Sequence, residues 1–269
     1  MSFKIVVCVK QVMDPDTPSS AFIVDETEKR VVPSQGIPPV VNGFCENAVE
    51  AALKIKESRS DAEVIVLSFG SGFVMDVMKK PLSMGADKMI LVETPDKDIS
   101  DPFQTATVLS EAIKKIGDSN IIICGQQASD WDHAQVPLGI SELLKMSCIT
   151  GAKKIEVQEN TVVAHSSNPD GYKVVEAPLP TLITVNSEIG EPRYPTLRGI
   201  MQASRKSPEL WSFDDIGINL DSSFSSMTLT ELYVPVSDQN CEIVEGESDE
   251  DSGRLLALKL REEKIIYLC

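Results

Sequence analysis

Short apolar runs alternate with amphipathic stretches over the first two-thirds of the chain. The runs are continuous and rich in Val and Ile, which is typical of strands buried on both faces of a sheet. Strands are predicted over 4–10, 63–70, 88–92 and 120–125, and helices over 44–58, 74–85, 102–116 and 133–145. Gly85 closes the second helix, Pro81 should kink or split it, and Asp101 is the predicted N-cap of the third.

The pattern changes after about residue 147. Polar and apolar residues alternate over 155–157, 162–164 and 173–175, with a turn at 168–171, which predicts an antiparallel meander. A buried strand at 182–185 and a short helix over 195–205 follow, and an earlier small hairpin is predicted around 22–32. The order predicts an α/β fold, in which helices cover both faces of a parallel sheet and the meander forms one edge.

The last sixty residues contain fewer apolar positions. Asp238 to Asp251 includes seven acids and no base, which indicates a solvated acidic linker. Helical periodicity returns over Arg254 to Ile266, so we expect the chain to end in an extended C-terminal arm with a docking helix.

Composition narrows the classes of partner. The 269 residues carry a formal charge of -16, which argues against a nucleic-acid or anionic membrane surface. Because there is no apolar run of about 18 residues and no signal-peptide h-region, we expect a cytoplasmic protein without membrane insertion. The six cysteines show no CxxC spacing, so no metal site and no disulfide framework is expected: Cys8, Cys45, Cys124, Cys148, Cys241 and Cys269.

The predicted strand ends suggest where a ligand binds. Lys10, Gly70 and Gly125 each end a strand and should lie along one rim of the sheet. Residues 126–136 then lead into a helix N-terminus, where free amides and the helix dipole favour an anion such as a phosphate. Neither GxGxxG nor a P-loop motif is present. On these residues alone, an ordinary strand-to-helix connection with Asp caps stays open.

Five segments occur together in a recognisable order: Val6–Val12, Asn42–Glu46, Met84–Asp87, Gly125–Val136 and Glu191–Met201. In order and spacing they resemble the beta subunit of electron-transfer flavoproteins, over residues 3 to 218. The resemblance implies a Rossmann-like domain of the adenine nucleotide alpha hydrolase type over 1–222. It also implies that the arm, 223–269, docks on the alpha subunit, as in longer-tailed members.

The resemblance implies an electron carrier and no catalytic residues. In this family an alpha–beta heterodimer passes electrons from dehydrogenases, such as the acyl-CoA dehydrogenases of fatty acid β-oxidation, to a quinone-linked oxidoreductase or another acceptor. One FAD is shared with the alpha subunit, and the beta subunit binds AMP or, in electron-bifurcating members, a second FAD. The expected nucleotide contacts are Cys8, Asn42, Gly43, Phe44, Cys45, Phe69, Gly125, Gln126, Gln127, Ala128, Ser129, Asp130, Trp131, Asp132, His133, Ala134, Gln135 and Val136.

Both nucleotides stay open at this point. His133 to Val136 is similar to the Thr-Ala-Gln-Val of bifurcating members, whereas the helix that contains Leu197–Gly199 and the long tail resemble non-bifurcating carriers. Trp131 stands where the family has a small or acidic residue, and it either stacks on the adenine or packs within the protein. Pro137 replaces a small residue.

The segment Tyr194–Lys206 matches the family's recognition loop for partner dehydrogenases. Its expected contacts are Tyr194, Leu197, Ile200 and Met201, with Leu197 as the apolar anchor. The alternative is that Leu197 packs on the subunit's own sheet. His133 is expected to cap its helix, and His165 lies on the meander, where many relatives carry acids that contact the flavin domain.

Two other classes compete with the carrier. An ATP-using enzyme could use Asp130 and Asp132 as a metal-binding pair, although no Gly-rich pyrophosphate loop accompanies them. A nucleotide-sensing protein of the same fold would lack the segment Glu191–Met201.

Overall fold

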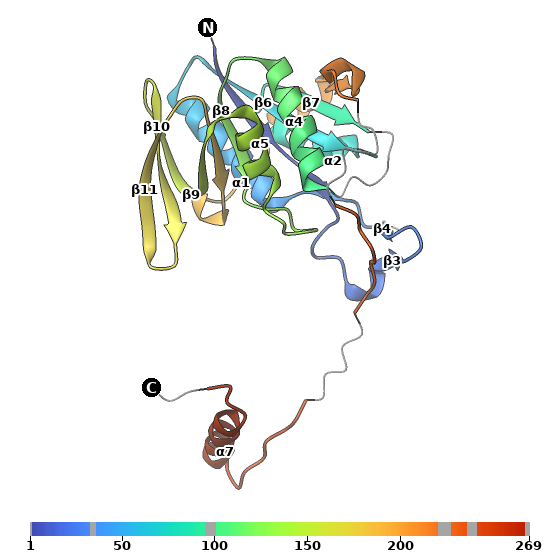
Figure 1. Ribbon diagram of the computed structural model, residues 1–269, viewed down its shortest axis with the longest axis vertical. Helices are drawn as coiled ribbons and strands as arrows, with labels where there is room; N and C mark the ends of the chain where they lie inside the picture. The colour runs from blue at the N-terminus through green and yellow to red at the C-terminus, as the bar shows by residue number, and fades with distance from the viewer. Residues whose placement is uncertain (1, 33–35, 95–100, 220–226, 236–240, 267–269) are drawn as a thin grey trace. The chain divides into compact units, whose positions relative to one another are not determined.

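One mixed sheet of nine strands organises the chain, in the order β11-β10-β9-β12-β8-β1-β6-β7-β13 (Figure 1). This computed structural model describes residues 2–32, 36–94, 101–219, 227–235 and 241–266, and the strand count refers to them. The sheet contains β1 (Phe3–Cys8), β6 (Ala62–Gly70), β7 (Lys88–Glu93), β8 (Ser119–Gly125), β9 (Ser147–Val157), β10 (Thr161–Asn168), β11 (Gly171–Pro178), β12 (Thr181–Val185) and β13 (Glu209–Trp211). In this spatial order, every neighbouring pair from β9 through β12, β8, β1, β6 and β7 to β13 is parallel. Within this sheet, the pairs β9–β10 and β10–β11 are antiparallel.

Helices cover both faces of the sheet, which explains the unbroken apolar runs. Ile5 and Val7 of β1 pack into the cluster beneath α1, whereas Val6 and Cys8 pack into the cluster beneath α4 and α5. Figure 1 shows α4 and α5 in front of the sheet and α1 behind it. The predicted parallel sheet with an antiparallel edge meander is confirmed.

The helices follow the predicted order. They are α1 (Gly43–Ser58), α2 (Met75–Met78), α3 (Lys80–Met84), α4 (Pro102–Ile116), α5 (Val136–Leu144), α6 (Leu197–Arg205) and α7 (Asp249–Glu262). The stretch around Pro81 is split into α2 and α3, as expected for a residue without an N–H. Asp101 caps α4, because its Oδ1 accepts from the Phe103 N–H at 2.7 Å.

α5 begins three residues later than predicted, at Val136. Asp132 and Ala134 have φ of 52° and 54°, in the left-handed region that a right-handed helix excludes. The N-cap position is therefore Gln135, and the prediction that His133 caps this helix is wrong.

Short strands and 3₁₀ turns lie outside the large sheet. Two small antiparallel pairs are present, of which the second is the predicted hairpin: β2 (Gln11–Val12) with β5 (Val40–Val41), and β3 (Ile23–Asp25) with β4 (Arg30–Val32). Three 3₁₀ turns lie among the described residues: η1 (Ser19–Ala21), η2 (Ser187–Ile189) and η3 (Asp214–Ile216). None of the described helices is both long enough and apolar enough to span a bilayer.

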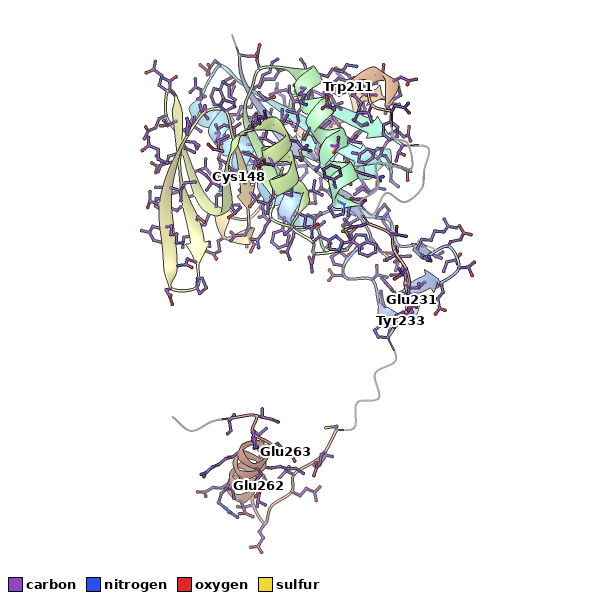
Figure 2. The ribbon with its side chains drawn as sticks, in the orientation of Figure 1. Cys148, Trp211, Glu231, Tyr233, Glu262 and Glu263 are labelled. Carbon is purple, nitrogen blue, oxygen red and sulfur yellow. The ribbon has the colours of Figure 1, made fainter. Side chains whose placement is uncertain are left out.

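The chain divides into two compact units, Met1–Tyr233 and Val234–Cys269, whereas the sequence suggested a boundary after residue 222. Tyr233, at the end of the first unit, is labelled in Figure 2. In the second unit, α7 starts at Asp249 and ends at Glu262 instead of spanning 254–266. Ser248 caps it, and three acids occupy its first turn, where the helix dipole favours negative charge.

The acidic run is therefore partly helix, which corrects the linker prediction for 249–251. Residues 238–240 of that run lie outside the described residues.

Candidate functional site

The sheet has a switch point between β1 and β8. From β1 the chain proceeds to β6 and β7 on one side, and it then crosses back to place β8 on the other side of β1. Cys8 at the end of β1 pairs in register with Cys124 near the end of β8. Ligands of open α/β sheets bind outside the carboxyl ends of the strands at such a point. The predicted loop therefore starts at the expected place.

α1 approaches β8 through Gly125. A Cβ added at Gly125 would lie 2.7 Å from the carbonyl carbon of Phe44 and 2.9 Å from the backbone nitrogen of Cys45. Real Cβ atoms do not tolerate such distances, so only glycine permits this contact. The N-terminus of α1 and the first residue of the loop, both predicted site segments, are brought together here.

Asn42 joins α1 to the loop. Its Nδ2 donates to the Gln127 carbonyl at 2.8 Å, and its Oδ1 accepts from the Ser129 N–H at 3.1 Å. Asn42 is 1% exposed and makes no side-chain cap to its own helix. The first amides of α1, those of Gly43 and Phe44, consequently receive no acceptor from the cap side chain and carry the positive end of the helix dipole.

The loop itself is held in an unusual conformation. Two non-glycine residues with positive φ, Asp132 and Ala134, follow each other closely. Gln127 Nε2 donates to Asp132 Oδ1 at 3.0 Å, and the Asp132 N–H donates to the Ala128 carbonyl at 2.8 Å. Backbone in sparsely populated regions persists where surrounding contacts determine it, and it is concentrated at functional sites.

One ion pair lies at the mouth of the site. Lys10, two residues beyond β1, places its Nζ 2.6 Å from Asp130 Oδ2. Because this lysine already has a carboxylate partner, an anion bound here would rely on backbone amides more than on a basic side chain. The sequence did not reveal this pair, although Lys10 and Asp130 each follow a strand at the switch point.

Three buried thiols lie beneath the loop. Cys45 Sγ accepts from Asn42 Nδ2 at 3.2 Å, and burial raises the pKa of the Cys45 thiol. A hydrogen bond with Cys8 and burial together raise the pKa of Cys124 well above its usual value. Since the thiolate is the nucleophile, the raised pKa values make Cys45 and Cys124 packing groups at neutral pH.

Other predicted residues lie at the periphery of this group. Phe69 packs its ring against Phe213, with centroids 5.9 Å apart, and it belongs to the cluster under α4. Trp131 is 37% exposed and lies 5.6 Å from the His133 ring, centroid to centroid. Gln126 donates its N–H to the Val185 carbonyl at 2.8 Å, which ties the start of the loop to β12.

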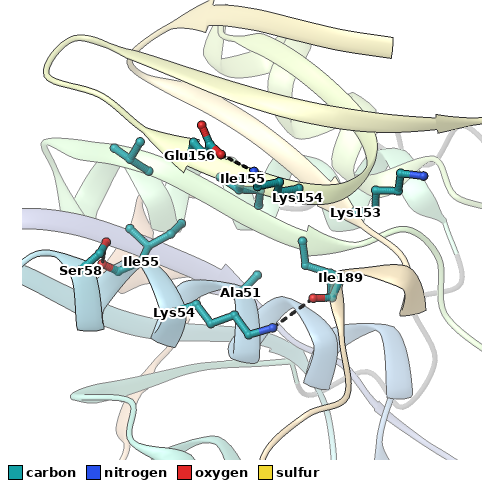
Figure 3. A pocket seen from close by; sticks show the side chains of 10 residues that line it. Ala51, Lys54, Ile55, Ser58, Lys153, Lys154, Ile155, Glu156 and Ile189 are labelled. Carbon is teal, nitrogen blue, oxygen red and sulfur yellow. Dashed lines mark hydrogen bonds and ion pairs between the residues drawn. The ribbon is translucent and has the colours of Figure 1, made fainter. Parts of the chain in front are cut away.

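A pocket of about 430 Å³ lies elsewhere, between α1 and β9 (Figure 3). None of the ten residues that line it belongs to the predicted nucleotide site. We place the candidate site at the switch point, because topology and helix termini favour an anion there.

The segment around α6 presents apolar side chains to solvent. The exposed fractions of Tyr194, Leu197, Ile200 and Met201 are 95%, 82%, 50% and 60%. α6 packs on α3 through its opposite face, where Ala203 is buried. The alternative that Leu197 packs on the subunit's own sheet is therefore wrong. A cluster of exposed apolar side chains is typical of a protein interaction site.

These features define a Rossmann-like α/β protein with a strand-order switch point between β1 and β8 and a helix, α6, that exposes apolar side chains. The profile of the electron transfer flavoprotein domain matches residues 30–216. The chain is 36% identical to the electron transfer flavoprotein subunit beta of Megasphaera elsdenii, with 98% of this chain and 100% of the relative aligned. It is 32% identical, at the same coverage, to the caffeyl-CoA reductase-Etf complex subunit CarD of Acetobacterium woodii.

The chain belongs to the electron transfer flavoprotein family and is a subunit of the beta type. Subunits of this type are electron carriers that pair with an alpha subunit, and the family binds FAD and AMP. The segment Glu191–Met201, which a nucleotide-sensing protein would lack, is present and leads into α6, which exposes Leu197 and Met201.

Proposed function

We propose that this chain is the beta subunit of a heterodimeric cytoplasmic electron carrier and that it binds AMP at the switch point, against the start of α1 and the loop that follows β8. The single observation that carries the proposal is the contact of Gly125 with the start of α1, which brings the helix N-terminus to the switch-point loop. FAD, shared with the alpha subunit, would supply the electron-transfer chemistry.

The residues present suit an adenine nucleotide. The amides of Gly43 and Phe44 would hold the phosphate, because the dipole of α1 favours an anion there. Nothing lies within 4 Å of a Cβ built at Gly43, so the protein leaves room for a ligand against this backbone. Asn42 would act through the loop, because both ends of its side-chain amide are engaged there.

Partner docking is assigned to the segment Tyr194–Lys206. Leu197 would enter an apolar pocket of a dehydrogenase, such as an acyl-CoA dehydrogenase of fatty acid β-oxidation, and the electrons would pass to a quinone-linked oxidoreductase or another acceptor. The second unit would dock on the alpha subunit. None of the described residues of α7 is buried, and Leu256 and Leu258 are 46% and 44% exposed.

A second candidate is a beta subunit that binds FAD instead of AMP, as in electron-bifurcating members. It is favoured by the alignment of almost the whole chain with a subunit named for a caffeyl-CoA reductase-Etf complex. It is also favoured by the sequence His133–Val136. FAD contains the AMP group, so the same helix N-terminus would hold either nucleotide.

The test is a nucleotide and flavin count on the purified alpha–beta complex. We expect one flavin and one AMP per heterodimer, identified by mass spectrometry after denaturation. Two flavins and no AMP would support the second candidate. ATP in place of both would overturn the carrier proposal and favour an ATP-using enzyme.

A further inference from the structure

α1 carries a line of polar side chains that the core does not require. Asn47, Glu50, Lys54 and Glu57 are spaced by three, four and three residues, so they lie along one face of the helix. Asn47 and Glu50 are only 7% and 4% exposed. Burying polar groups costs free energy unless they are paired, so this line needs partners.

Those partners lie in the segment Ile189–Arg193, which precedes α6. Asn47 Nδ2 donates to the Gly190 carbonyl at 2.9 Å, and Lys54 Nζ donates to the Ile189 carbonyl at 3.1 Å. Figure 3 shows Lys54 pointing from α1 to Ile189. Gly190 has φ of 120°, and a Cβ there would lie 2.8 Å from Lys54 Nζ.

Glu50 makes the strongest of these contacts. Its Oε2 accepts from Arg193 Nε at 2.7 Å and from the Arg193 backbone N–H at 3.1 Å, while its Oε1 accepts from Arg193 Nη2 at 3.0 Å. A two-pronged pair of this kind fixes orientation as well as position. Glu57 contacts the same guanidinium but its side chain is 60% exposed, so it contributes less.

Arg193 lies four residues before Leu197, where α6 begins. The other side of α6 is fixed by close packing, since a Cβ at Gly199 would lie 2.3 Å from the Ser83 carbonyl oxygen in α3. α3 is itself tied to the first turn of α1 by the ion pair of Lys80 with Glu46. α1, which starts at the candidate nucleotide site, thus holds α6 from two sides.

We propose that Glu50 is a positioning residue for partner docking. Its carboxylate holds Arg193 and thereby sets where the exposed anchor Leu197 stands. The proposal rests on the proposed function, in which α6 docks a dehydrogenase. Glu50 itself is only 4% exposed, so it would act through Arg193 and not by touching the partner.

The test compares the intact heterodimer with its Glu50→Gln variant. The probe is an acyl-CoA dehydrogenase reduced by butyryl-CoA, and the rate of heterodimer flavin reduction is followed against dehydrogenase concentration. We expect the KM for the dehydrogenase to rise about tenfold with kcat, flavin and nucleotide content unchanged. Hydrogen exchange should also become faster over Ile200 to Ala203. Glu111→Gln, which removes a half-buried ion-paired glutamate on α4, is the matched control and should change nothing.

The outcomes separate this proposal from the function on which it rests. If Leu197→Ala raises the KM and Glu50→Gln leaves it unchanged, the positioning role is overturned while the docking function stands. If Leu197→Ala leaves the KM unchanged, the docking function fails and the role of Glu50 fails with it.

A second variant covers the case in which Glu50→Gln does not fold. Arg193→Lys keeps the positive charge beside Glu50 but loses the two-pronged contact. It should raise the KM several-fold at unchanged kcat. An unchanged KM in this variant overturns the proposal.

Discussion

The candidate nucleotide site and the exposed face of α6 are built on opposite principles. In the candidate site, Asn42 is buried with both ends of its side-chain amide hydrogen-bonded, and Gly125 has no room even for a methyl group. On α6, Leu197 is 82% exposed and its side chain faces solvent. The first region is defined by contacts already made, and the second by contacts still available.

This difference determines which property a substitution in each region should change. Substitutions in the candidate site disturb packed backbone, so they should lower the free energy of unfolding together with nucleotide binding. Substitutions on the exposed face of α6 remove nothing from the folded chain, so they should change partner affinity alone. A variant on α6 that lowers the free energy of unfolding, or a variant near Gly125 that changes partner affinity alone, would contradict this distinction.

The largest effect is expected from Gly125→Ala. The new Cβ would collide with the backbone of Phe44 and Cys45, so α1 would have to move away from β8. We expect a loss of about 2–4 kcal/mol in the free energy of unfolding of the heterodimer, measured by chemical denaturation, and a loss of bound nucleotide. Gly43→Ala is the control for stability, since its Cβ meets nothing within 4 Å. An unfolding midpoint that stays at the wild-type value in Gly125→Ala would show that α1 can shift without cost.

The next largest effect is expected from Leu197→Ala, which should weaken the affinity for the partner dehydrogenase. Truncation of a central apolar anchor costs about 2 kcal/mol of binding, which is roughly thirtyfold in affinity. The KM for the reduced dehydrogenase should rise accordingly, while the unfolding midpoint and the nucleotide content stay constant. If the variant instead unfolds at a lower denaturant concentration than the wild type, Leu197 contributes to the core. The two regions would then not differ in the way described.

A smaller effect concerns Glu50, which links the two regions. Burial raises the pKa of this carboxyl, but the hydrogen bonds from Arg193 outweigh burial, so the net pKa is lowered. A lowered folded pKa gives stability that is present above the unfolded pKa, about 4.3, and is lost as the pH falls through the folded value.

The free energy of unfolding of the wild type should therefore exceed that of Glu50→Gln by about 1–3 kcal/mol at pH 7. This range already allows for solvent screening of the ion pair, because the Arg193 side chain is one-third exposed. The gap should shrink below about pH 4. Denaturation curves between pH 3 and 7 test this. A gap that is constant over that range would contradict the assigned ion pair.

The sequence predicted the elements well where a single force decided them. Continuous Val and Ile runs specify buried strands, and Asp101 before Pro102 specifies a helix start, which Asp101 does cap. The start of α5 was mispredicted because helical periodicity does not reveal that Asp132 and Ala134 adopt positive φ. That conformation depends on contacts such as Gln127 with Asp132, which only the fold provides.

The candidate site could also be predicted in part from the sequence. Strand ends and the family resemblance located the loop, but the pairing of Lys10 with Asp130 depends on which strands become neighbours. The role of the polar line on α1 could not be predicted from the sequence. Asn47, Glu50 and Lys54 lie at helical spacing, but such a line is also typical of a solvent-exposed helix face, so only the fold shows that the segment Ile189–Arg193 packs against it.

The smallest change to the fold is expected from Gly43→Ala, and it tests the candidate site most directly. Alanine suits a helix better than glycine, so the free energy of unfolding should rise by about 0.5–1 kcal/mol or stay constant. The new methyl group meets no protein atom within 4 Å. It would meet a phosphate held by the amides of α1, so the nucleotide content of the purified heterodimer should fall while the fold is retained. Full nucleotide content in this variant would show that the nucleotide does not contact the start of α1, and the site would then have to be sought along the loop after β8.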